Sequence, residues 1–190
     1  CMLDFRPVGY VVGLLVFGLG VSMLFPMLWD SYQGNGHWFI FLESALLTCT
    51  IGGLTALASA NGSTDRLSIQ QTFILTTSVW IALPLFGALP FYLGNTGISF
   101  VDSFFEAMSG LTTTGSTILV GINDLPEGLK LWRGLLQWFG GIGVIVMAMV
   151  FLPALRIGGM QLFRSEGFDT FGKILPRAGQ IAQSISIIYL

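Results

Sequence analysis

The sequence predicts an all-α integral membrane protein, and its composition and the spacing of its apolar residues lead to that prediction. Charged residues make up 9% and hydrophobic residues 53% of the 190 residues, whereas soluble globular proteins carry roughly 25% charged residues. The mean hydropathy is high, at +0.78. The apolar residues gather in segments of about 20, the length that a helix needs to cross a bilayer. These segments predict two N-terminal transmembrane helices, followed by two further spans that flank a shorter helix.

Other classes of protein are excluded by the same composition. An aromatic content of 13% is too high for a disordered chain. A net charge of −2 without a run of basic residues offers no electrostatic surface for nucleic acid. The two cysteines, Cys1 and Cys49, are not expected to form a disulfide. The single histidine, His37, leaves no cluster for zinc or haem, so no covalently bound cofactor is expected.

Residues 1–65 are expected to hold the two N-terminal transmembrane helices. The first covers Pro7–Leu28, where only Gly, Ser and Pro interrupt the apolar residues. This segment is too long for the hydrophobic region of a signal peptide, and no small-x-small cleavage site follows it. The second covers Trp38–Ala58 and carries one acidic residue, Glu43, near enough to its start for the side chain to reach the membrane surface.

Residues 66–180 are expected to form a second unit, with spans over 72–93 and 131–155 and a cytoplasmic loop over 156–180. The chain stops within the apolar residues 181–190, so it is expected to be a piece of a longer protein in which a further unit begins there. Two prolines are expected to kink the first of these spans: Pro84 and Pro90. Three glycines in the second are expected to serve close helix packing rather than a gating hinge: Gly140, Gly141 and Gly143.

The apolar segment 100–110 between these spans is too short to cross a bilayer, since a helix of that length extends only about 16 Å. Ser99 and Asp102 form the Ser-x-x-Asp pattern that begins helices, and Gly110 is a suitable end. A short capped helix, followed by a polar run with a glycine and set between two spans, is typical of a re-entrant segment.

The distribution of Lys and Arg predicts a cytoplasmic N-terminus. With that orientation six basic residues face the cytoplasm: Arg6, Arg66, Arg156, Arg164, Lys173 and Arg177. Two lie on the external side: Lys130 and Arg133. Five acidic residues are expected to form an external surface that attracts cations: Asp30, Asp102, Glu106, Asp124 and Glu127. Three tryptophans near span ends are expected to anchor at the membrane surface: Trp29, Trp38 and Trp132.

The polar run 112–117 (TTTGST) would lie at membrane depth in such a re-entrant segment. Non-helical backbone is tolerated there only when it is buried in protein or lines a water-filled cavity. Carbonyl oxygens without helical partners can replace the hydration shell of a cation, as they do in potassium filters. Gly115 can adopt the positive φ that turns neighbouring carbonyls the same way. Helix 100–110 would direct the negative end of its dipole toward the ion.

Two alternatives stay open for these polar positions. The run 112–117 is either a filter strand or only a helix C-cap and loop, and its place between a capped half-helix and a span favours the filter. Asp102 and Glu106 share one helix face, where they either attract cations at the outer mouth or brace the filter. The alternative, which capping preferences favour, is that Asp102 caps the helix and Glu106 binds neighbouring backbone.

Three stretches resemble the Trk/Ktr/HKT superfamily of potassium transporters. Phe100–Thr117 (FVDSFFEAMSGLTTTGST) resembles its first pore region. Gln137–Val144 (QWFGGIGV) and Leu155–Arg164 (LRIGGMQLFR) resemble the helix after the pore and its cytoplasmic exit. Within the superfamily the likeness is closest to the N-terminal portion of the membrane subunit of bacterial Trk systems (TrkH/TrkG), and it extends over essentially the whole chain.

The resemblance implies a pore of four concatenated helix–pore-helix–helix repeats, each of which contributes one strand to a selectivity filter. This chain would hold two extra N-terminal helices and the first repeat. The filter positions that the resemblance implies are Thr113, Thr114, Gly115 and Ser116, flanked by Thr112 and Thr117. K⁺, the transported ion, would be coordinated by the backbone carbonyls of Thr113 and Thr114.

The resemblance also implies a cellular setting. It implies potassium uptake, with or without symport of a second ion, across the bacterial cytoplasmic (inner) membrane. The implied partners are the remaining pore repeats, a second copy of the full-length chain in a homodimer, and a nucleotide-binding cytoplasmic regulatory subunit of the TrkA kind. Four basic residues are candidate contacts for that subunit or for anionic lipid: Arg156, Arg164, Lys173 and Arg177.

Two other functions compete with transport. A non-conducting membrane scaffold or assembly subunit would use TTTGST only as a buried turn. An intramembrane enzyme would need a nucleophile with a base, a metal pair or two facing carboxylates. The sequence contains neither His-Glu-x-x-His nor Gly-x-Ser-x-Gly, so a transporter rather than an enzyme is expected.

Overall fold

The computed structural model describes residues 5–34, 36–62, 68–94, 96–121 and 124–155, and the elements within them are helices. In chain order they are α1 (Arg6–Ser22), α2 (Leu24–Tyr32), α3 (Trp38–Ser59), a 3-10 turn (Ala60–Gly62), α4 (Ile69–Gly87), α5 (Leu89–Leu93), α6 (Phe100–Leu111) and α7 (Glu127–Leu155). The predicted loop 156–180, its four basic candidates and the segment 181–190 lie outside the described residues.

Three helical stretches within the described residues are long and apolar enough to span a membrane: Arg6–Tyr32, Trp38–Ser59 and Gln70–Leu93. They correspond to the first three predicted spans. The fourth predicted span lies in α7, which has 29 residues and begins at Glu127, earlier than the apolar residues alone suggested. Lys130 binds Glu127 at 2.9 Å in that first polar turn. That α7 crosses the membrane stays a prediction.

The two prolines of the third span have different places in the structure. Pro84 lies inside α4, whereas Pro90 lies at the start of α5. Between the two helices, Ala88 is at once the C-cap of α4 and the N-cap of α5. Proline is tolerated in the first turn of a helix because the N–H that it lacks has no helical partner there. The span is therefore interrupted just after Gly87, where one carbonyl becomes available to another helix.

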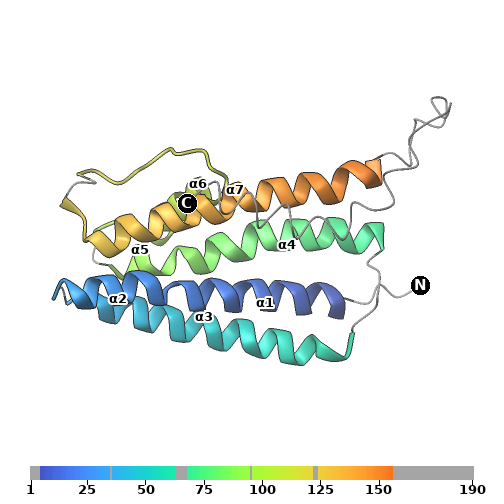
Figure 1. The fold of residues 1–190 in the computed structure, drawn as a ribbon, viewed down its shortest axis with the longest axis horizontal. Helices are drawn as coiled ribbons and strands as arrows, with labels where there is room; N and C mark the ends of the chain where they lie inside the picture. The colour runs from blue at the N-terminus through green and yellow to red at the C-terminus, as the bar shows by residue number, and fades with distance from the viewer. Residues whose placement is uncertain (1–4, 35, 63–67, 95, 122–123, 156–190) are drawn as a thin grey trace.

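The long helices lie side by side along one axis (Figure 1). The α1–α3 pair forms one side, α7 forms the other, and α4 lies between them. The short α6 contacts both α4 and α7. The ends of α2 and α5 and the beginnings of α3 and α7 all lie at one end of the molecule. From this shared end α6 runs back alongside α7, and its last residue, Leu111, meets α7 at Gly140, 13 residues after the start of that helix at Glu127.

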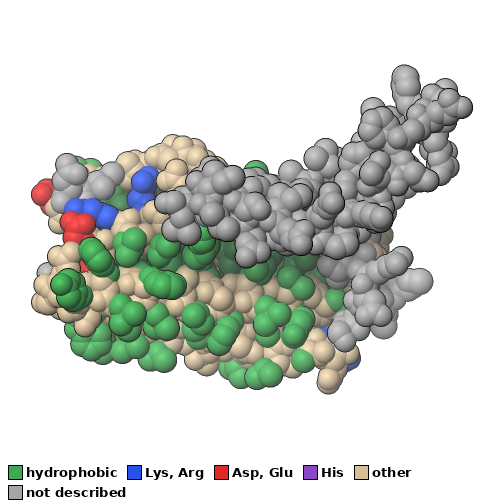
Figure 2. All heavy atoms as spheres, in the orientation of Figure 1, with side chains coloured by type: hydrophobic (Ala, Val, Ile, Leu, Met, Phe, Trp, Pro, Cys, Tyr) green, Lys and Arg blue, Asp and Glu red, His purple; other side chains and the backbone are tan. Residues whose placement is uncertain are grey.

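Glycines allow α1 and α3 to approach closely. A Cβ added at Gly13 would lie 2.5 Å from the backbone nitrogen of Ala56, and one added at Gly52 would lie 2.5 Å from that of Phe17. Small residues at such contacts are typical of helix pairs in lipid. Figure 2 shows hydrophobic side chains over the face formed by α1 and α3, with acidic and basic side chains gathered near the end where α7 begins.

The most deeply buried side chains lie where the N-terminal helices meet the rest of the chain. Phe41, Phe91 and Trp132 are all buried. The expectation that Trp132 anchors at the membrane surface is wrong, because its side chain is 0% exposed and its Nε1 donates to the carbonyl oxygen of Gly87 at 3.0 Å. The free end of the α4 backbone gives this indole a partner inside the protein. Trp29 and Trp38 are exposed, as expected of surface anchors.

Candidate functional site

The site begins at the N-terminus of α6, which is fixed by a capping box. The Ser99 hydroxyl oxygen accepts from the backbone N–H of Asp102 at 3.2 Å. The Asp102 carboxylate accepts in return from the backbone N–H of Ser99 at 3.2 Å and from its hydroxyl at 2.8 Å. Asp102 is thus used locally, and the reciprocal bonds satisfy two N–H groups that a helix start leaves free.

At the other end of α6 the chain folds back over the helix. The backbone N–H of Thr113 donates to the carbonyl of Gly110 at 3.0 Å, and that of Thr114 donates to the carbonyl of Ser109 at 3.0 Å. The last carbonyls of the helix are therefore satisfied by the polar run itself. The run lies against the C-terminal end of α6, which is the negative pole of the helix dipole.

The backbone of this run turns at two positions that are two residues apart. Gly115 has φ 77°, the conformation that the sequence analysis assigned to it. Thr113 has φ 56°, which a residue with a Cβ rarely adopts. Its hydroxyl donates to the carbonyl of Thr112 at 2.7 Å, and its N–H is held by α6. Backbone conformations of this kind persist where the surroundings hold them, and they cluster at functional sites.

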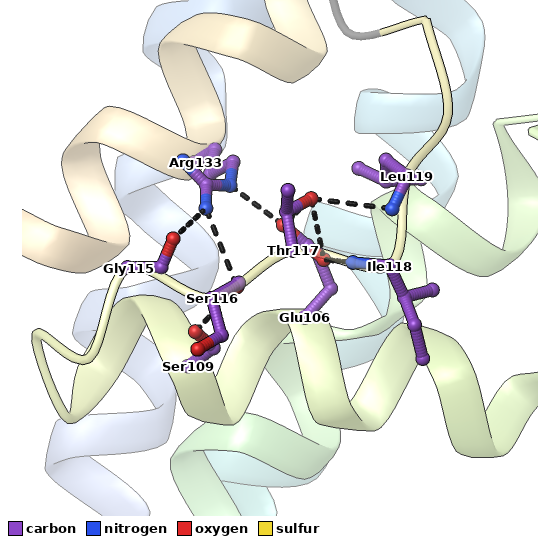
Figure 3. A network of polar contacts seen from close by, with 8 residues as sticks. All are labelled: Glu106, Ser109, Gly115, Ser116, Thr117, Ile118, Leu119 and Arg133. Atoms are coloured by element: carbon purple, nitrogen blue, oxygen red, sulfur yellow. Dashed lines mark hydrogen bonds and ion pairs between the residues drawn. The ribbon is translucent and has the colours of Figure 1, made fainter.

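Glu106 supports the run from below (Figure 3). Its side chain is 0% exposed. The carboxylate accepts from the backbone N–H of Ile118 at 3.1 Å and from the hydroxyl of Thr117 at 3.0 Å and 3.1 Å. It also binds Arg133 of α7, with 2.6 Å between Oε1 and Nε. The acid thus braces the strand through backbone, hydroxyl and guanidinium together, rather than through neighbouring backbone alone.

Arg133 joins α7 to the same strand. Its Nη2 donates to the carbonyl of Gly115 at 3.2 Å and reaches that of Ser116 at 3.5 Å. The hydroxyl of Ser109 donates to the Ser116 carbonyl at 2.6 Å. The carbonyls of Thr113 and Thr114, in contrast, accept no hydrogen bond from the described part of the chain. Within the described residues, the strand therefore has two carbonyls that accept hydrogen bonds from side chains of α6 and α7, and two carbonyls that have no donor.

Two members of this site, Arg133 and Ser109, were missed as functional residues by the sequence analysis. Arg133 was counted only as an external cation. Its position inside the predicted span 131–155 was the available signal, since an ionisable residue within a span marks function by default. Ser109 gives no such signal, because a serine in a short helix is common and its partner is set by the turn that follows.

The predicted external acidic surface is also partly wrong. Asp30 and Glu106 are each 0% exposed, so neither contributes to a surface. Asp30 accepts from the backbone N–H of Gly128, and Glu106 is engaged by Arg133. Burial is possible for both because each carboxylate has donors inside the protein. Glu127 remains exposed on the surface, where it binds Lys130.

Close packing of α7 on the end of α6 leads to a testable prediction. A Cβ added at Gly140 would overlap the carbonyl oxygen of Leu111 and come within 2.6 Å of its carbon. Gly140→Ala is expected to lower the yield of folded, monodisperse protein in detergent several-fold, because overpacking costs about 1–3 kcal/mol and the atoms that the Cβ meets here belong to the backbone. Gly143→Ala is the control, since a Cβ there meets no described atom within 4 Å. Equal yields of the two variants would contradict the packing argument.

Comparisons with known proteins identify the family. Residues 37–190 match the model of the TrkH family, described as a cation transport protein. The Trk system potassium uptake protein TrkI of Halomonas elongata is 51% identical over 187 residues, covering 96% of this chain and 37% of that protein. The Trk system potassium uptake protein TrkH of Escherichia coli K12 is 36% identical over 191 residues, covering 99% of this chain and 39% of that protein.

A solved structure shares the fold. The crystal structure of the potassium transporter TrkH from Vibrio parahaemolyticus matches with a TM-score of 0.80 and 33% identity, covering 98% of this chain and 37% of that one. The prediction of an all-α membrane protein is confirmed, as is that of a transporter family rather than an enzyme. The chain spans between 37% and 39% of the length of these relatives. It is a bacterial membrane protein, and it belongs to the TrkH family of cation transport proteins.

Proposed function

We propose that this chain is the N-terminal part of the pore-forming subunit of a potassium uptake system. In this proposal residues 113–116 form one strand of the selectivity filter. The observation that carries the proposal is the division of the carbonyls. Those of Gly115 and Ser116 are held by Arg133 and Ser109, whereas those of Thr113 and Thr114 have no donor among the described residues.

The available carbonyls suit the chemistry of a dehydrated cation. K⁺ enters a filter when carbonyl oxygens replace the water molecules of its hydration shell, and no covalent step is involved. The carbonyls of Thr113 and Thr114 supply such oxygens, and the C-terminal end of α6 adds a negative potential beneath them. Arg133 and Glu106 hold the strand at residues 115–118. In this proposal that support limits the reorganisation of the neighbouring Thr113 and Thr114 carbonyls when the ion arrives.

One strand cannot surround an ion, so the remaining strands must come from elsewhere. The chain spans 37% of the length of the Halomonas relative, which leaves room in a longer chain for three further repeats. Residues 113–118 are exposed in this chain, which leaves them accessible to the strands that this proposal requires. The 190-residue chain alone is therefore expected to conduct no potassium.

The N-terminus is proposed to face the cytoplasm, in the inner membrane. Of the two basic residues on the external side, Arg133 is bound within the site and Lys130 is paired with Glu127. Pairing with an acidic residue does not remove a basic residue from the positive-inside count, so the support for this orientation is the count of six cytoplasmic against two external Lys and Arg residues. A homodimer of the full-length chain and a nucleotide-binding cytoplasmic regulatory subunit complete the proposal, and both come from the resemblance to Trk systems.

The test of this function uses the full-length parent gene in a bacterial strain that lacks its own potassium uptake. Growth on limiting potassium should be restored, and Rb⁺ uptake by the cells should be saturable and inhibited by K⁺. The 190-residue chain, expressed at the same level, serves as the control and should restore nothing. No rescue by full-length protein that has been detected in the membrane would favour the scaffold function instead.

A further inference from the structure

Asp30 is a buried carboxylate that the proposed filter does not use. It lies near the end of α2 and is 0% exposed. Its Oδ1 accepts the backbone N–H of Gly128 at 2.8 Å, across 98 residues of sequence. Its Oδ2 has no hydrogen-bond partner among the described residues. A carboxylate is costly to bury, so its place at this junction calls for a compensating interaction.

The start of α7 supplies that compensation. The helix begins at Glu127, so the N–H of Gly128 is one of the donors that have no partner within the helix. The same end is the positive pole of the helix dipole, which favours a negative charge. A Cβ added at Gly128 would overlap the Asp30 carboxylate, so glycine is what permits this contact. Asp30 thus caps α7 from a different helix.

A second contact holds the next turn of α7 against the N-terminal helices. The ring of Phe41 on α3 meets that of Trp132 edge-on, with 6.5 Å between the ring centroids. The Trp132 indole is held at the same time by the Gly87 carbonyl. Arg133 follows directly in sequence, and its guanidinium holds the carbonyls of Gly115 and Ser116.

We propose that Asp30 is a positioning residue for the selectivity filter. By capping α7 it sets where that helix begins, and therefore where Arg133 holds the filter strand. A helix transmits such a constraint because Gly128 and Arg133 are separated by only about 7.5 Å of helical rise. The inference rests on the proposed function, and it gives the two N-terminal helices a role in ion binding.

The choice of substitutions follows from the hydrogen bond. Asp30→Asn keeps an oxygen that can accept from Gly128, whereas Asp30→Leu has a similar size and keeps none. Hydrogen bonds to charged groups are strong enough for their loss to change an affinity on the order of ten-fold. Asp30→Leu is therefore expected to raise the apparent KM for K⁺ about ten-fold and to reduce discrimination against Na⁺. Asp30→Asn should stay within about two-fold of the parent.

One control tests whether the effect depends on the position of the carboxylate, and the other tests whether it depends on where a Cβ is added to α7. Glu43 is an exposed carboxylate on α3, so Glu43→Gln should leave the KM unchanged. Gly128→Ala disturbs the same contact from the α7 side and should raise the KM as Asp30→Leu does. Gly134→Ala, where a Cβ meets no described atom within 4 Å, is its matched control.

Two measurements on the full-length protein decide the matter. The first is Rb⁺ uptake, divided by the amount of protein in the membrane. The second is the K⁺ concentration that gives half of the maximal increase in the thermal midpoint of the purified protein. This measurement does not depend on transport. Asp30→Leu and Gly128→Ala should shift both concentrations together. If Asp30→Leu does not reach the membrane, Gly128→Ala carries the test.

The possible failures are distinct. Unchanged K⁺ dependence in both variants, with lower thermal stability, would reduce Asp30 to a structural cap and overturn the inference. An unmutated full-length protein that neither takes up Rb⁺ nor is protected by K⁺ would overturn the proposed function itself, and with it this inference. An equal shift in Glu43→Gln would show that any carboxylate in these helices has the effect, and would also overturn it.

Discussion

Replacing Gly115 with valine in the full-length protein is expected to reduce potassium uptake to background. Gly115 has φ 77°, and a β-branched residue is a genuine outlier at such an angle. Valine would drive the backbone toward negative φ and so rotate the peptide group that joins Thr114 to residue 115. The Thr114 carbonyl would then point away from the ion path. Rb⁺ uptake and growth on limiting potassium measure this loss.

The expected loss is a backbone effect rather than a clash within this chain. A Cβ added at Gly115 meets no described atom within 4 Å. The folded chain therefore has room for the side chain, and the variant should still reach the membrane. What changes is the orientation of carbonyls on which ion dehydration depends.

Gly97 provides a matched control for backbone strain. It has φ 73°, and a Cβ added there also meets no described atom within 4 Å. It precedes α6 rather than following it, so Gly97→Val imposes similar strain outside the filter strand. Gly97→Val should keep most of the uptake. If Gly115→Val retained uptake, or if both variants lost it equally, residues 113–116 would not be the filter strand.

The sequence was sufficient to predict the parts of the fold that depend on local pattern. The apolar segments gave the helix ranges to within a few residues, because burial in lipid requires long uninterrupted runs. Ser99 and Asp102 predicted the start of α6, since a capping box is formed by residues three apart. Gly115 was singled out because a positive φ is a property of one residue and its neighbours.

The contacts that the sequence could not predict join residues far apart along the chain. Arg133 and Glu106 are 27 residues apart, and Asp30 and Gly128 are 98 apart. In both pairs a charged residue near a span end looks like a surface residue, because no local pattern reveals a buried partner. The surface position predicted for Trp132 was wrong for the same reason. The Gly87 carbonyl that its indole binds is available only because the helix is interrupted after Gly87, 45 residues away in sequence.

Removing either member of the Glu106–Arg133 pair is expected to destabilise the protein and impair uptake. Glu106 is 0% exposed, whereas the side chain of Arg133 is 21% exposed. Breaking a buried pair by removing one partner costs about 3–5 kcal/mol, because a buried charge is left uncompensated. Arg133→Gln should therefore lower the thermal midpoint of the purified full-length protein by several degrees. Glu106→Gln should have a smaller effect, since the charge it strands is partly in water.

The double variant separates stability from ion binding. Glu106→Gln with Arg133→Gln leaves no unpaired charge, so much of the lost stability should return. Uptake should not return with it, because the carbonyls of Gly115 and Ser116 would still lack the guanidinium that holds them.

Arg133→Lys tests the geometry of this contact at constant charge. A single ammonium cannot reproduce a planar guanidinium that contacts a carboxylate and two carbonyls at once, so this variant should also lose uptake.

The Lys130–Glu127 pair is the control, because it lies on the same helix and joins the same types of charge at 2.9 Å. Its side chains are 28% and 51% exposed, and exposed pairs contribute about 0–1 kcal/mol. A double-mutant cycle should give a coupling energy of several kcal/mol for Glu106–Arg133 and nearly none for Lys130–Glu127. Comparable couplings would mean that Glu106 and Arg133 form an ordinary surface pair. Recovery of uptake in the double variant would mean that the filter strand does not need Arg133 to hold its carbonyls.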